Sequence, residues 1–168
     1  MAAVFVAFRT LCYMAGFILV FGWLASRVQP LDERLRIPLP GWTTAVGVLV
    51  GTIGAVIVFA CAGVFVLRGR GTPAIFDPPR KFVAVGPYKF VRNPMYIGGF
   101  IMLMGFGLYR QSLAMLLFAV VIFVLFHLYV VFIEEPGLET RFGENYFTYK
   151  ELVNRWIPRF SNRTRAAP

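Results

Sequence analysis

The chain consists of four apolar runs joined by shorter polar stretches. The first run extends from about Val4 to Ala25 and the second from about Trp42 to Leu67. Each is long enough to cross a hydrocarbon core about 30 Å thick, which takes ~20 helical residues. A third, shorter run extends from about Pro94 to Tyr109, and a fourth from Ser112 to Ile133. The pattern predicts an all-α integral membrane protein with four transmembrane helices.

The last two runs are separated only by Arg110 and Gln111, which predicts a tight antiparallel helical hairpin. Pro94 fits the first turn of a helix, where its missing amide hydrogen is harmless. Because the third run is short for a spanning helix, we expect it to begin inside protein rather than in lipid.

Glycines interrupt the second run, and Gly47 and Gly51 form a GxxxG pair. Small residues at this spacing let two helices approach closely in lipid. A chain with 16 glycines also produces such a pair by chance, so the sequence leaves both interpretations open.

The composition supports a membrane location. Of the 168 residues, 58% are hydrophobic and 15% are charged, whereas a soluble domain carries about 25% charged residues. The excess excludes an ordinary cytosolic enzyme, a disordered chain and a disulfide-stapled secreted fold, and the length indicates a single membrane domain over residues 1–168. Cys12 and Cys61 both lie in apolar runs and are interpreted as small hydrophobic residues rather than a redox pair or metal site.

The net charge of +9 comes from 17 basic and 8 acidic residues. Basic residues beside apolar segments set topology and meet anionic lipid headgroups, so we expect no nucleic-acid partner. Four spans place two basic-rich regions on one side, which should be cytoplasmic together with both termini. These residues are Arg68, Arg70, Arg80, Lys81, Lys89 and Arg92 before the third helix, and Arg141, Lys150, Arg155, Arg159, Arg163 and Arg165 in the tail.

The chemistry-bearing residues concentrate in residues 71–96 and in the tail, residues 134–168. The tail starts with Glu134 and Glu135, directly after the fourth run. Acidic residues at the C-terminus of a helix oppose its macrodipole, and a cationic ligand group would relieve that cost. This reasoning indicates a binding role at the cytoplasmic end of the fourth helix.

Apolar and aromatic residues recur in the tail at helical spacing. Their steps of four, three, four and three residues predict one helical face, which serves as an interfacial anchor, as a lid over a site, or as both. The residues are Phe142, Tyr146, Tyr149, Val153 and Trp156.

His127 is the only histidine and lies within the fourth run, on one predicted helical face with Glu134. An ionisable residue inside a membrane is a candidate functional residue. A histidine there also serves as a hydrogen-bonding partner for a neighbouring helix, and the sequence leaves both roles open.

Three motifs in order resemble the isoprenylcysteine carboxyl methyltransferase family, which belongs to a wider group with phospholipid N-methyltransferases. The resemblance covers roughly residues 71–160 and implies a small polytopic helical bundle that binds S-adenosylmethionine at its cytoplasmic mouth. The motifs are Gly86-Pro-Tyr-Lys-Phe-Val-Arg-Asn-Pro-Met-Tyr-Ile-Gly98, Glu134-Glu135, and Phe142-Gly-Glu-Asn-Tyr-Phe-Thr-Tyr149 with Trp156-Ile-Pro158.

The resemblance also assigns residues to the cofactor, and Arg92 is added as a partner for the cofactor carboxylate. A carboxylate such as Glu134 pairs with a cation, and aromatic rings enclose an adenine or a sulfonium. The resulting set is Arg80, Lys81, Phe82, Val83, Tyr88, Arg92, Asn93, Pro94, Met95, Tyr96 and Glu134.

Two positions depart from the family pattern. Asn93 stands where the family has histidine, and asparagine does not titrate near neutral pH, so a binding role is expected there. Val130 stands where isoprenylcysteine enzymes have an arginine that holds the substrate carboxylate. A carboxylate in lipid without a cation is costly, which argues against prenylcysteine and leaves the acceptor open.

The sequence therefore predicts a membrane methyltransferase whose lipid or lipophilic acceptor enters from the bilayer. His127 is the candidate base if the acceptor is an ammonium, or it orients the acceptor headgroup. Two alternatives stay open, an NADPH-dependent sterol or steroid reductase and a non-enzymatic membrane protein that kept the fold. The oligomeric state is left open.

Overall fold

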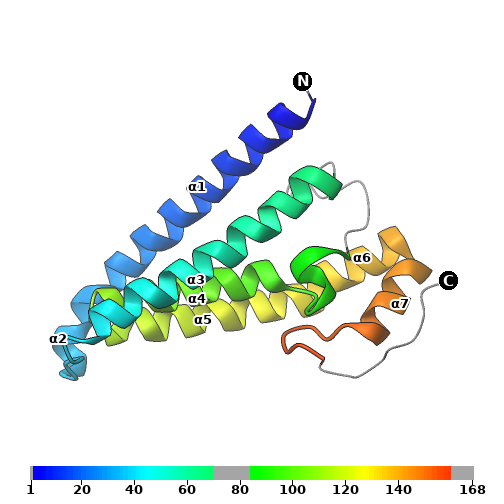
Figure 1. Ribbon diagram of the computed structural model, residues 1–168. Helices are drawn as coiled ribbons and strands as arrows, with labels where there is room; N and C mark the ends of the chain where they lie inside the picture. The colour runs from blue at the N-terminus through cyan, green and yellow to red at the C-terminus, as the bar shows by residue number, and fades with distance from the viewer. Residues whose placement is uncertain (1, 70–83, 160–168) are drawn as a thin grey trace.

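The computed structural model describes residues 2–69 and 84–159, and within these ranges the chain forms helices and turns and no strand (Figure 1). The helices are α1 (Ala2–Val28), α2 (Asp32–Leu35), α3 (Thr43–Val64), α4 (Pro94–Tyr109), α5 (Leu113–Tyr129), α6 (Glu135–Phe142) and α7 (Glu144–Leu152). Short 3-10 helices lie at Gln29–Leu31 and Gly86–Lys89, and π-helical turns at Phe65–Gly69 and Val130–Glu134.

Among the described residues, three continuous helical stretches are long and apolar enough to cross a membrane, namely Phe5–Leu35, Thr43–Leu67 and Leu113–Phe142. Helix α4 is equally apolar in character but shorter. The all-helical architecture of a membrane protein, predicted from the apolar runs, is therefore confirmed, and α4 has the predicted bounds.

Helix α4 lies at the centre of the bundle, between α3 and α5 (Figure 1). No residue from Pro94 to Leu108 is exposed. Its 16 residues span ~24 Å at 1.5 Å per residue, less than the ~30 Å of a hydrocarbon core. Neighbouring helices cover much of α4, as expected for a helix too short to span the hydrocarbon core by itself.

Helices α3 and α4 touch backbone to backbone through glycines. A Cβ atom added to Gly54 would lie 2.5 Å from the Met102 amide nitrogen, and one added to Gly47 would meet the backbone of Tyr109. On α4, a Cβ atom on Gly105 would lie 2.8 Å from the Gly47 carbonyl oxygen. Gly47 is therefore a contact residue rather than a chance occurrence, as the close-contact interpretation of the GxxxG pair predicted.

The α4–α5 hairpin forms as predicted. Gln111 adopts a left-handed conformation with φ of 52°, and the Ser112 hydroxyl accepts a hydrogen bond from the Met115 amide at the start of α5. Asp32 of α2 accepts a hydrogen bond of 2.8 Å from the Ala114 amide in the first turn of α5. A negative charge is stabilised near the N-terminus of a helix. The connection between α1 and α3 is thereby attached to this end of the bundle.

The sequence predicted that the fourth transmembrane helix ends at Ile133, and this prediction is wrong. The helix continues through the π-helical turn into α6 and ends at Phe142. A proline inside a helix disrupts the backbone hydrogen bonds of the preceding turn. The π-helical turn directly precedes Glu135 and Pro136, and it accommodates this disruption. Glu134 is therefore not at a helix C-terminus, and the argument from the macrodipole for its role is wrong.

The predicted aromatic face of the tail is confirmed in part. Tyr146, Tyr149 and Val153 are buried together against Phe142 and other apolar side chains. The single helical face predicted from Phe142 to Trp156 is wrong, however, because Phe142 ends α6, Gly143 separates it from α7, and α7 ends at Leu152. Beyond Leu152 the chain turns back toward α5 (Figure 1).

We predict that Gly105→Ala lowers the melting temperature of the detergent-purified protein. The added methyl group would meet the backbone of α3, and overpacking of this kind costs about 1–3 kcal/mol, more than the gain of up to ~1 kcal/mol in helix propensity. Gly99→Ala is the matched control on the same helix, because nothing lies within 4 Å of its added Cβ atom. Equal melting temperatures for the two variants would contradict the close contact.

Candidate functional site

A hydrogen-bonded pair connects the two strongest sequence candidates. The Tyr96 hydroxyl, in the first turn of α4, donates to Glu134 Oε2 at 2.7 Å. Glu134 is half-buried at the junction of α5 and α6. Within the described residues this carboxylate has no cationic partner. A half-buried carboxylate that lacks a counter-charge is suited to binding a cationic ligand group.

The neighbouring carboxylate, Glu135, is satisfied within the protein. Its Oε1 accepts hydrogen bonds from Arg92 Nη2 at 2.8 Å and from Arg155 Nε at 2.7 Å, and its Oε2 accepts from Arg155 Nη2 at 2.8 Å. The Glu135 side chain is only 5% exposed. The hydrogen bonds that Arg155 donates to Glu135 raise the pKa of the Arg155 guanidinium. The two adjacent acids thus differ, since Glu135 belongs to an internal ion cluster and Glu134 has no cationic partner among the described residues.

Arg92 attaches the loop before α4 to the tail. Its Nη1 donates to the carbonyl oxygens of Lys150 and Val153, each at 3.2 Å, and its amide donates to the Asn154 carbonyl at 2.9 Å. Its side chain is 9% exposed. Nε of Arg92 is a buried donor with no acceptor among the described residues. A buried donor left unpaired costs free energy, so this nitrogen is suited to an anionic ligand group.

The remaining candidates before α4 pack into the protein. Tyr88 is buried against Cys61 and Phe65 of the α3 end, burial raises the pKa of its phenol, and its carbonyl accepts a 2.6 Å hydrogen bond from the Tyr149 hydroxyl. Met95 packs against the same cluster. Both side chains therefore contribute to the packing of the mouth, and their predicted contact with a cofactor stays a prediction.

Asn93 and Pro94 form the start of α4. Both residues are buried, and Asn93 Nδ2 donates to the Arg155 carbonyl at 3.5 Å, a long hydrogen bond. Pro94 occupies the first turn of the helix, as predicted. The predicted cofactor contacts Arg80, Lys81, Phe82 and Val83 lie outside the described residues.

His127 contacts the tail. The indole Nε1 of Trp156 donates to His127 Nδ1 at 3.0 Å, and the Trp156 ring also lies 5.0 Å from the ring centroid of Phe123. The sequence motif contained Trp156, but it carried no signal for this contact, because the two residues lie on different segments 29 positions apart.

Aromatic rings line the helices below the Glu134–Tyr96 pair. Phe126 of α5 lies 5.1 Å from Tyr96, between centroids, and 5.8 Å from Phe17 of α1. Phe123, one turn deeper, lies 4.8 Å from Phe100 of α4. The polar groups thus lie at one end of the bundle, with an apolar and aromatic environment next to them on the membrane side.

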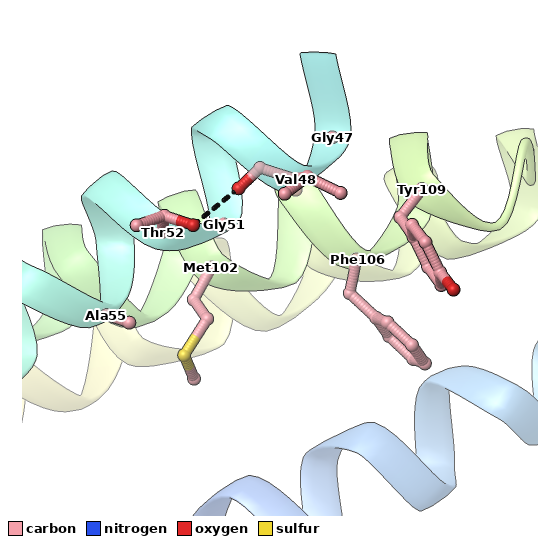
Figure 2. A pocket seen from close by; sticks show the side chains of 9 residues that line it. Gly47, Val48, Gly51, Thr52, Ala55, Met102, Phe106 and Tyr109 are labelled. Carbon is pink, nitrogen blue, oxygen red and sulfur yellow. Dashed lines mark hydrogen bonds between the residues drawn. The ribbon is translucent and has the colours of Figure 1, made fainter. Parts of the chain in front are cut away.

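A shallow groove of about 310 Å³ lies between α3 and α4 at the other end of the bundle. Figure 2 shows Met102, Phe106 and Tyr109 projecting to the same side of α4, along the segment of α3 that carries Val48 and Thr52. Tyr96 is ~20 Å from Tyr109 along the helix at 1.5 Å per residue. The groove is therefore separate from the place where Tyr96 meets Glu134.

Comparison with protein families gives one result for this chain. A sequence model of the phospholipid methyltransferase family matches residues 42–145, more than half of the 168 residues. The matched region contains α3, α4, α5 and α6, and with them Arg92, Tyr96, Glu134 and Glu135. No curated protein matches the chain.

We predict that Glu135→Gln destabilises the protein by about 3–5 kcal/mol, because it leaves the buried Arg92 guanidinium without its counter-charge. Thermal unfolding in detergent measures the effect. Glu139→Gln is the control on the same helix, since the Glu139–Lys150 ion pair is about 30% exposed and such pairs contribute at most ~1 kcal/mol. A stability of Glu135→Gln equal to that of Glu139→Gln would refute the structural role of the buried cluster.

Proposed function

The chain belongs to the phospholipid methyltransferase family, and from that premise we propose that it is an S-adenosylmethionine-dependent membrane methyltransferase acting on a lipophilic acceptor. The observation that carries the proposal is the Glu134 carboxylate, which is held by Tyr96 and has no cationic partner among the described residues. It lies where polar residues of the mouth meet the aromatic part of the bundle.

The residues present fit the amino acid end of S-adenosylmethionine, which carries an ammonium and a carboxylate. Glu134 would hold a cationic group through a charge-assisted hydrogen bond. The unpaired Nε of Arg92 would donate to the carboxylate. The same Arg92 keeps its other nitrogens on Glu135 and on the tail, so its orientation is fixed before any ligand binds.

When bound, S-adenosylmethionine supplies a methyl group activated by a sulfonium. The protein's contribution is then positioning, since a methyl transfer needs the acceptor in line with the bond that breaks, and correct orientation alone accounts for a large share of rate acceleration. Tyr96 supports this task by holding Glu134 in one position. The rigid packing of α4 against α3 in turn fixes Tyr96.

We propose that the acceptor is a lipid whose reacting group is not a carboxylate. Val130, at the position of the substrate-binding arginine in isoprenylcysteine enzymes, is fully buried and carries no charge. Arg92 and Arg155 are both bound to Glu135. A carboxylate in the aromatic part of the site would thus lack a described counter-charge, which is costly, whereas a neutral or amine-bearing headgroup has no such requirement.

We propose further that the chain crosses the membrane four times as a single membrane domain, with the Glu134 end and both termini in the cytoplasm, as the distribution of basic residues predicts. A single cysteine at the exposed Asn145 position, in a background lacking Cys12 and Cys61, should react with an impermeant reagent only in opened cells. A cysteine in place of the exposed Arg34 should react in intact cells. The reverse result would place the site away from its cofactor supply.

The function is tested by incubating the purified protein with a membrane lipid extract and methyl-labelled S-adenosylmethionine. We expect label in a lipid species, and we expect Glu134→Gln to lose S-adenosylmethionine affinity by roughly 10- to 150-fold, the equivalent of ~1.5–3 kcal/mol for a hydrogen bond to a charged group. Glu139→Gln is the control and should bind as the wild type does.

Unchanged calorimetric affinity in Glu134→Gln would remove the carboxylate from the cofactor site. Binding of NADPH in place of S-adenosylmethionine would indicate a reductase, and binding of neither would indicate a protein without this enzymatic activity.

A further inference from the structure

We infer that Trp156 is a positioning residue that fixes the tautomer of His127, so that His127 presents an Nε2–H donor to the acceptor and does not act as a base. The inference deepens the proposed function and rests on it for the role of His127 toward the acceptor. The tautomer itself follows from the geometry alone.

A neutral imidazole has one nitrogen that donates and one that accepts, whereas an indole nitrogen only donates. Because Trp156 Nε1 lies 3.0 Å from His127 Nδ1 and donates to it, Nδ1 must carry the lone pair. The proton of the neutral ring is then on Nε2. Neither ring nitrogen keeps a free lone pair, so His127 cannot accept a proton while this contact is in place.

The position of Trp156 is set by the residues that precede it. Val153 is buried in the cluster of the tail, the Asn154 carbonyl accepts from the Arg92 amide, and Arg155 binds Glu135 through two nitrogens. These consecutive contacts hold the chain along the α5–α6 helix, and the Trp156 indole packs on Phe123. The contacts of the tail therefore hold the Trp156 indole N–H beside His127.

The donor role suits the location of His127. The residue is half-buried and lies seven residues before Glu134, which is ~10 Å along the helix, toward its membrane part, at 1.5 Å per residue. A lipid headgroup next to Glu134 offers acceptor oxygens on that side. An Nε2–H group can hold such an oxygen and orient the headgroup without a change of charge in the membrane.

The full-length protein with ¹⁵N-labelled histidine tests the tautomer directly, because the chain contains one histidine. We expect the wild-type spectrum to show an unprotonated, hydrogen-bonded Nδ1 and a protonated Nε2. Trp156→Phe keeps an aromatic ring but removes the donor, so the Nδ1 signal should lose its hydrogen-bond shift and both tautomers should appear. Trp42→Phe, at an exposed site on the α3 side, is the control and should leave the spectrum unchanged.

Turnover measurements distinguish a hydrogen-bond donor role of His127 from a general-base role. We expect Trp156→Phe to lower kcat about tenfold while the affinity for S-adenosylmethionine stays within twofold of wild type. His127→Gln keeps an N–H donor near the Nε2 position and should retain turnover within about tenfold. His127→Ala should lower kcat by at least ~10²-fold, the low end for removal of one preorganised hydrogen-bond donor from an active site.

Equal turnover of His127→Gln and His127→Ala would overturn the donor role, as would a wild-type spectrum with protonated Nδ1 or one that Trp156→Phe leaves unchanged. If the wild-type protein transfers no methyl group, the proposed function fails, and the spectrum still decides whether Trp156 sets the tautomer of His127.

Discussion

A carboxylate that is removed from solvent requires cations and hydrogen-bond donors around it, and Glu135 imposes this requirement on the whole mouth of the bundle. Its partners are Arg92 in the loop before α4 and Arg155 in the tail, and both bind the same carboxylate at the start of α6. The loop, the helix and the tail are thereby held as one unit. In the part of the chain that the structure describes, the neighbouring carboxylate of Glu134 has no such counter-charge.

The membrane part obeys a different constraint, which is the close approach of α3 and α4. Glycines at the contact let the backbones of α3 and α4 approach closely. The first turn of α4 carries Tyr96, and the ion cluster of Glu135 holds the loop just before it. The position of Tyr96 therefore depends on apolar packing from one side and on electrostatics from the other.

The apolar pattern predicted the helices well, because burial in lipid requires long runs that a sequence displays directly. The pairing of distant side chains could not be predicted in the same way. Nothing in the residues Glu134 and Glu135 themselves distinguishes the acid that is enclosed by arginines from the acid that is not. The helix end near Pro136 was also misjudged, since a proline that usually ends a helix is here accommodated by a preceding π-helical turn. Of the predicted cofactor residues, Tyr96 and Glu134 meet, whereas Tyr88 and Met95 pack into the core.

The contacts that stabilise the tail are also the contacts that would complete a site. Arg155 binds the buried carboxylate, and the next residue, Trp156, reaches the only histidine of the chain. The contact of the tail with Glu135 and the contact of Trp156 with His127 are therefore coupled, because release of the tail from Glu135 would also remove the indole from His127. The ion cluster of Glu135 and the half-buried His127 are thus connected through two consecutive residues of the tail.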